Sequence, residues 1–186
     1  MQVGFYGGSF DPPHMGHVLA VTCALMAGGF ERVLVVPVYG HAFEKYLTPF
    51  VHRLRMCQLA MGWLPGVDIS DVEESLDVPN LTLMTLRKIR AENPDYRLRL
   101  IVGSDVLEDA TKWHAFEEVK RIAAPFVLGR AGYDHPDAIA LTLPRVSSGQ
   151  VKDLLTRRSD PDAERQLAAL VPAKVLAYVE EHGLYR

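Results

Sequence analysis

The N-terminal segment constrains the fold more than any other part of the chain. A short apolar run, Val3–Tyr6, leads into a glycine-rich string, Gly7–His17 (GGSFDPPHMGH), and then into an amphipathic stretch from about Gly16 to Met26. This order predicts a strand, a tight turn and the start of a helix, an arrangement whose free backbone N–H groups can hold a phosphate. The segment therefore predicts an α/β protein with an anion site beside its first strand.

The residue types of this string suit chemistry at a phosphate. Gly7 and Gly8 permit positive φ angles and close approach of a ligand to the backbone. His14 and His17, spaced i and i+3, fall on one face of the first helical turn, so both rings would face an anion bound at the helix start. A structural role explains His14 alone equally well, whereas the whole string points to a nucleotide phosphate as the ligand.

Apolar runs and helical patterns alternate along the rest of the chain. The predicted strands are 2–6, 32–37, 67–70, 97–102, 125–129 and 140–143, and the further predicted helices are 50–63, 82–91, 112–123, 148–156 and 172–181. This alternation predicts a doubly wound open parallel sheet, whose ligands bind at the carboxyl ends of the strands. We expect a single domain over residues 1–186, with 146–186 as its C-terminal helical part.

Charge and hydropathy argue against several classes of protein. The chain has 20 Lys and Arg against 23 Asp and Glu, a formal net charge of −3, and no basic run that suggests nucleic acid. Its longest mostly apolar stretch, 18–30, is shorter than the roughly 18 residues that a membrane-spanning helix requires, and no signal-peptide pattern is visible. Cys23 and Cys57 show no CxxC spacing, which predicts reduced thiols in a cytoplasmic protein.

The glycine spacing argues against a bound dinucleotide cofactor. After the first predicted strand the glycines run Gly4-x-x-Gly7-Gly8 rather than GxGxxG, and no acidic residue ends the second predicted strand. NAD(P) is therefore not expected as a cofactor.

A second candidate segment follows the predicted strand 97–102. Gly103 permits close approach of a ligand, and Asp105 can accept hydrogen bonds from ribose hydroxyls or an adenine amino group. Trp113 offers a flat face for a base or a pyridine ring, although packing on the core also explains a tryptophan at a helix start. These residues are candidates for contact with a nucleotide.

A third and a fourth candidate segment lie late in the chain. Ser147 and Ser148 are good N-cap residues for the predicted helix 148–156, whose exposed N–H groups can also bind a triphosphate. Lys152 lies one turn beyond Ser148 and can reach the same anion. Arg130, at the end of a predicted strand, is suited either to a phosphate or to holding a loop.

The string Gly8–His17 resembles the phosphate motif of the HxGH nucleotidylyltransferases, in the form typical of bacterial nicotinate mononucleotide adenylyltransferases. The C-terminal segment 172–185 also resembles that family's signature, so the resemblance covers the chain from end to end. The resemblance implies a Rossmann-like nucleotidylyltransferase fold and attack of a mononucleotide phosphate on the α-phosphorus of ATP, with release of pyrophosphate. It also implies ATP and nicotinate mononucleotide as partners. Because no cluster of carboxylates appears near the motif, we expect Mg²⁺ to bind through the ATP phosphates and no metal to be held by the protein.

The resemblance assigns roles by matching positions. The catalytic residues would be His14, His17 and Lys152. Acceptor-binding residues would be Thr82, Thr85 and Trp113. The residues that bind ATP or its phosphates would be Gly8, Ser9, Phe10, Lys45, Gly103, Asp105, Arg130, Ser147 and Ser148.

Three departures from the family pattern concern these roles. Lys152 stands where arginine is common, so the charge is kept but the forked geometry is lost. Lys45 would replace the lysine of a "PPHK" segment that this chain lacks. Leu81 and Met84 replace the aromatic residue and the acid of "SYTxDTL", next to the expected acceptor pocket.

These departures keep other functions open. Nicotinamide mononucleotide, phosphopantetheine or another phosphorylated acceptor remains an alternative substrate. A nucleotide-sensing module that binds ATP or NAD without turnover is an alternative of a different class, although pure binding does not need both His14 and His17. A metal held by these two histidines is a third alternative, for which no further ligand is obvious. The oligomeric state stays open, a homo-oligomer included.

Overall fold

A six-stranded, wholly parallel sheet forms the centre of the molecule. The computed structural model describes residues 1–40, 46–79, 81–107 and 113–186. The strands lie in the order β3-β2-β1-β4-β5-β6. Their bounds are β1 (Gln2–Gly8), β2 (Arg32–Pro37), β3 (Val67–Ile69), β4 (Arg97–Gly103), β5 (Ala124–Arg130) and β6 (Ala138–Leu143). The chain builds outward from β1 in both directions, so the switch point of the sheet lies between β1 and β4.

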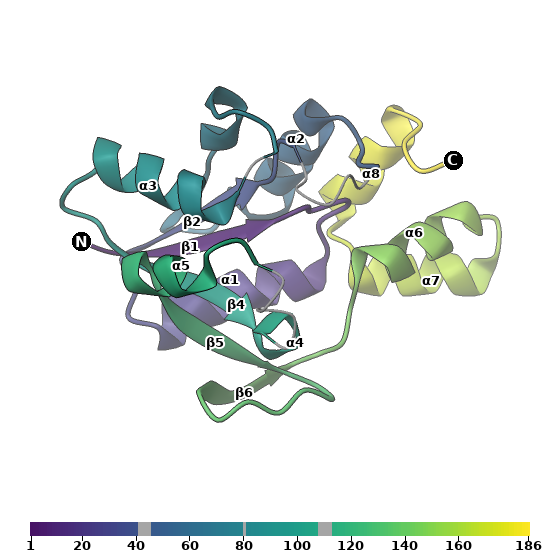
Figure 1. The fold of residues 1–186 in the computed structure, drawn as a ribbon. Helices are drawn as coiled ribbons and strands as arrows, with labels where there is room; N and C mark the ends of the chain where they lie inside the picture. The colour runs from purple at the N-terminus through teal and green to yellow at the C-terminus, as the bar shows by residue number, and fades with distance from the viewer. Residues whose placement is uncertain (41–45, 80, 108–112) are drawn as a thin grey trace.

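Helices cover both faces of this sheet (Figure 1). Their bounds are α1 (Met15–Ala27), α2 (Phe50–Met61), η1 (Val72–Ser75), α3 (Thr82–Glu92), α4 (Ser104–Leu107), α5 (Phe116–Ile122), α6 (Ser148–Thr156), α7 (Pro161–Leu170) and α8 (Ala173–Glu181). One apolar core joins the sheet to α3 and α5, and the other joins it to α1, α2 and the three C-terminal helices. Strands buried on both faces are apolar throughout, as in Val33–Val36 of β2.

The predicted doubly wound fold is confirmed, and each predicted strand appears within two residues of its expected bounds. α7 was not predicted from the sequence, and the helix expected over 112–123 begins only at Phe116, after Ala115 in the left-handed region (φ 50°). The helix expected to end at Trp63 ends at Met61. Trp63 is 64% exposed, and its indole N–H donates to the carbonyl of Ala60 at 3.0 Å, so it does not belong to the core.

Two further findings bear on the class of protein. Within the residues that the structure describes, no helix has the length and apolar character needed to cross a membrane. Cys23 and Cys57 are both free thiols, and Cys57 is buried.

Candidate active site

A cavity of about 730 Å³ opens at the carboxyl ends of β1 and β4, at the switch point. The loop after β1, the start of α1, the end of β4 and the start of α6 all contribute to its wall. The sequence-predicted residues that line it are Gly8, Ser9, Phe10, His14, His17, Thr82, Gly103, Asp105, Trp113, Arg130, Ser147 and Ser148. The fold thus brings together segments that are more than 130 residues apart in the chain.

The two histidines stack against each other in this cavity. Their ring centroids are 3.7 Å apart with an interplanar angle of 25°. His14 precedes the first turn of α1, and its backbone N–H donates to Nδ1 of His17 at 3.1 Å. A neutral His17 ring whose Nδ1 accepts a hydrogen bond carries its proton on Nε2. His17 therefore has a ring N–H left to donate to a ligand.

Both rings are neutral near pH 7. Burial, and then the charge of Arg130, lower the pKa of His14 to about 4. Burial, with smaller contributions from His14 and Arg130, holds the pKa of His17 well below its ordinary value. In the free protein the pair is thus a set of neutral hydrogen-bonding groups rather than a pair of cations.

The low pKa of His14 predicts a pH-dependent stability. Between pH 4 and 6.5 the unfolded chain binds a proton that the folded chain does not, so the free energy of unfolding should fall as pH falls through this window. At pH values below both pKa values of His14, the total loss of unfolding free energy is roughly 3 kcal/mol. Urea denaturation at pH 4.5 and 7 should therefore show a smaller pH effect in His14→Gln than in the wild type. Equal pH effects in the two proteins would contradict this explanation.

Three buried polar atoms at the cavity have no hydrogen-bond partner among the described residues: His14 Nδ1, Asp105 Oδ1 and Arg130 Nε. Asp105 Oδ2 and Arg130 Nη1 form an ion pair at 3.2 Å, and Arg130 also donates to the carbonyl of Val146. Buried polar groups without partners are costly, so such atoms mark places where a ligand can supply hydrogen bonds. Arg130 thus holds the loop before α6 and still has a free donor.

Ser147 and Ser148 tie the start of α6 to the site. Ser147 caps the helix, since its Oγ accepts from the N–H of Gln150 at 3.1 Å. Ser148 Oγ donates to the carbonyl of Pro12 at 2.9 Å, within the loop that follows β1. The N-termini of α1 and α6 therefore border one cavity, and their positive dipole ends favour an anion there.

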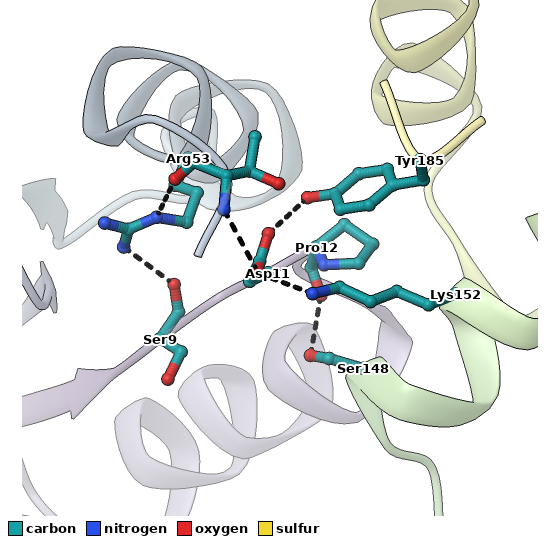
Figure 2. A network of polar contacts seen from close by, with 8 residues as sticks. Ser9, Asp11, Pro12, Arg53, Ser148, Lys152 and Tyr185 are labelled. Atoms are coloured by element: carbon teal, nitrogen blue, oxygen red, sulfur yellow. Dashed lines mark hydrogen bonds and ion pairs between the residues drawn. The ribbon is translucent and has the colours of Figure 1, made fainter. Parts of the chain in front are cut away.

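Two of the predicted site residues do not line the cavity. The Lys152 ammonium contacts Oδ2 of the buried Asp11 at 2.6 Å, because α6 directs this side chain at the carboxylate (Figure 2). Thr85 is fully buried, and its hydroxyl donates to Oε1 of Glu73 at 2.8 Å. A direct contact of either residue with substrate is therefore not supported by their positions. Lys45 lies outside the described residues.

Sequence reasoning missed Glu73. This side chain lines the cavity, is 5% exposed and accepts from the backbone N–H of Tyr39 at 3.0 Å as well as from Thr85. Burial raises its pKa, and these two hydrogen bonds oppose that effect. Nothing local distinguishes Glu73 from its exposed neighbour Glu74, so only the fold reveals that it joins η1 to α3 and to the segment that follows β2.

An open parallel sheet, with a glycine-rich turn after its first strand and a cavity at its switch point, is the arrangement of α/β nucleotide-binding proteins. Comparison with known proteins narrows this class. Residues 5–141 match the family model described as cytidylyltransferase-like, and the chain belongs to that family.

Curated relatives match the chain along its whole length. A "probable nicotinate-nucleotide adenylyltransferase" of Anaeromyxobacter sp. (strain K) is 40% identical over 188 residues, which cover 100% of this chain and 97% of that protein. The nicotinate-nucleotide adenylyltransferase of Bacillus subtilis (strain 168) is 28% identical, with 99% and 98% covered. The Plasmodium falciparum nicotinic acid mononucleotide adenylyltransferase complexed with NaAD shares the fold, with a TM-score of 0.83 at 20% identity and coverage of 99% and 97%.

Proposed function

We propose that this protein is an enzyme that transfers the adenylyl group of ATP to nicotinate mononucleotide and releases pyrophosphate. The observation that carries the proposal is the stacked pair His14 and His17, which shares one cavity with the N-termini of α1 and α6. The full-length similarity to nicotinate-nucleotide adenylyltransferases supports the choice of acceptor.

The reaction needs no general base. A phosphate monoester is already largely anionic near neutral pH, since its second pKa is about 6. An oxygen of the acceptor phosphate attacks the α-phosphorus of ATP, a new P–O bond forms, and the bond to the bridging oxygen breaks as pyrophosphate leaves. Catalysis then consists of holding the groups in line and stabilising charge on the phosphoryl oxygens. We propose that the Nε2–H of His17 and the backbone N–H groups at the starts of α1 and α6 stabilise that charge.

We assign the other predicted lining residues to the two substrates. On the ATP side we place Gly8, Ser9, Phe10, Gly103, Asp105, Arg130, Ser147 and Ser148, and we expect Lys45 to join them. On the acceptor side we place Thr82 and Trp113. Leu81, one of the two departures in the acceptor segment, also lines the cavity, whereas Met84 is exposed.

Magnesium is expected to enter with ATP rather than to reside on the protein. The part of the chain that the structure describes contains no group of three His, Cys, Asp or Glu side chains able to hold a metal ion. Two carboxylates lie close in sequence to the glycines of the site. Asp11 pairs with Lys152, and Asp105 pairs with Arg130. We propose that the triphosphate oxygens bind Mg²⁺, which would neutralise part of their charge.

The acceptor assignment is tested by supplying ATP with one candidate acceptor at a time and measuring pyrophosphate release. We expect kcat/KM for nicotinate mononucleotide to exceed that for nicotinamide mononucleotide or phosphopantetheine by at least about tenfold, the equivalent of one hydrogen bond to a charged group. A preference for the amide would overturn the assignment. Tight ATP binding without pyrophosphate release for any acceptor would instead indicate a sensing module.

A further inference from the structure

Asp11 is a buried carboxylate that the proposed reaction does not use directly. It is 1% exposed and lies in the loop between β1 and α1. Its oxygens accept from Lys152 Nζ at 2.6 Å, from the hydroxyl of Tyr185 at 2.6 Å and from the N–H of Thr48 at 3.4 Å (Figure 2). One side chain of the loop thus joins α6, the C-terminal segment and the segment before α2.

The same loop is held from a second side by Arg53 of α2. Its Nη1 donates to the carbonyl of Ser9 at 3.0 Å, and its Nε donates to the carbonyl of Thr48 at 2.7 Å. Figure 2 shows Arg53 and Tyr185 approaching the loop from different elements. The residues on either side of Phe10, Ser9 and Asp11, are therefore both anchored by long-range polar contacts.

Phe10 needs such anchors. Its φ of 47° lies in the left-handed region, which L-residues with bulky side chains rarely occupy. In this conformation the ring is 1% exposed and lies edge-on to His17, with centroids 4.9 Å apart. The position of the His17 ring therefore depends on a loop conformation that surrounding contacts must maintain.

Tyr185 reaches Asp11 in an unusual conformation of its own. Its φ is 62°, although it is not a glycine, and the Lys152 ammonium lies 5.4 Å from its ring centroid. Burial favours the neutral form of Asp11, but the hydrogen bonds from Lys152, Tyr185 and Thr48 outweigh it and hold its pKa below the ordinary value. The carboxylate is thus charged, and two of its three partners, Lys152 and Tyr185, come from the C-terminal part of the chain.

We propose that Asp11 is a positioning residue for adenylyl transfer, and that Lys152 and Tyr185 act on the reaction through it. Together they hold the loop between β1 and α1, which contains Phe10. They thereby hold the His17 ring in a position to contact the α-phosphate. This inference rests on the proposed function. In this inference the Lys152 ammonium pairs with Asp11 and does not bind the triphosphate.

The variant Tyr185→Phe tests this role with a minimal change. Loss of one hydrogen bond to a charged group should lower kcat by about tenfold to a hundredfold. KM for ATP should change little, because no contact with ATP is removed. The matched control is Tyr178→Phe on α8. The hydroxyl of Tyr178 forms its hydrogen bond with Nδ1 of His52, at 2.9 Å, and not with the loop between β1 and α1. The control should retain wild-type kinetics.

A double-mutant cycle tests whether Lys152 acts through Asp11. Lys152→Met and Asp11→Asn should each lower kcat, and Lys152→Met should have no further effect in the Asp11→Asn protein. A further rise in KM for ATP in the double variant would show a direct contact of Lys152 with the triphosphate and overturn the inference. An unchanged kcat in a folded Tyr185→Phe protein would overturn it as well.

A readout that needs no turnover separates this inference from the proposed function. The ring resonances of His14 and His17 in NMR spectra should shift in Tyr185→Phe and stay in place in Tyr178→Phe. If the wild type released no pyrophosphate with any acceptor, the proposed function would fail while this coupling could still be measured. Unmoved His14 and His17 resonances in Tyr185→Phe would refute the coupling itself.

Discussion

Replacing His17 with alanine is expected to lower kcat for pyrophosphate release by at least about 10²–10³. This is the usual effect of removing one preorganised donor from a site where charge develops, equal to roughly 3–4 kcal/mol of transition-state stabilisation. The donor is the Nε2–H of His17, since Nδ1 is engaged by the backbone N–H of His14. Stopped-flow or coupled assays of pyrophosphate release measure the effect, and thermal denaturation checks that the variant is folded.

A second substitution separates catalysis from helix capping at this position. His17→Asn keeps an acceptor near the place of Nδ1, so the N–H of His14 can remain bonded, but it has no donor at the place of Nε2. If His17 serves the reaction, the asparagine variant should be as slow as the alanine variant. If asparagine restored most of the rate, His17 would serve only to cap α1. Wild-type turnover in the alanine variant would show that His17 has no role in the reaction.

The sequence predicts the fold and most of the cavity because the signals for them are local. Apolar runs such as Val33–Val36 mark buried strands, and Ser147 marks the start of α6 at the expected residue. In a parallel sheet the carboxyl ends of the strands meet at one edge, so residues that follow different strands can be assigned to one site without knowing their contacts. This is why Asp105 and Trp113 both line the cavity with His14.

Contacts that depend on distant partners could not be predicted in this way. Lys152 lies one turn from Ser148, a spacing that predicts a contact with the bound anion. In the structure its ammonium instead pairs with Asp11, a buried carboxylate 141 residues earlier in the chain. Tyr185 and Arg53 carry no local signal for their contacts with the loop. α7 is a different case, because its start is signalled locally by Asp160 as N-cap and Pro161 in the first turn. Only two of its residues, Ala163 and Leu167, are buried.

Arg53→Met is expected to cause the largest loss of stability among these substitutions. Arg53 is 1% exposed, and its guanidinium donates to the partly buried carbonyls of Ser9 and Thr48. Methionine fills much of the volume but donates nothing, so two partly buried acceptors lose their donors, at a cost of about 1 kcal/mol each. The positive charge near Asp11 is lost as well. Urea denaturation at pH 7 measures the change in the free energy of unfolding.

Arg55→Met is the matched control, because Arg55 lies on the same helix, is exposed and donates only to the side chain of Gln58 within the described contacts. It should change the free energy of unfolding by no more than about 0.5 kcal/mol. Arg53→Lys should fall between the two, since an ammonium keeps the charge but cannot direct donors at both carbonyls. Equal losses in Arg53→Met and Arg55→Met would mean that the anchoring of Ser9 contributes nothing to folding. The strained conformation of Phe10 would then have to be maintained by the contacts of Asp11 alone.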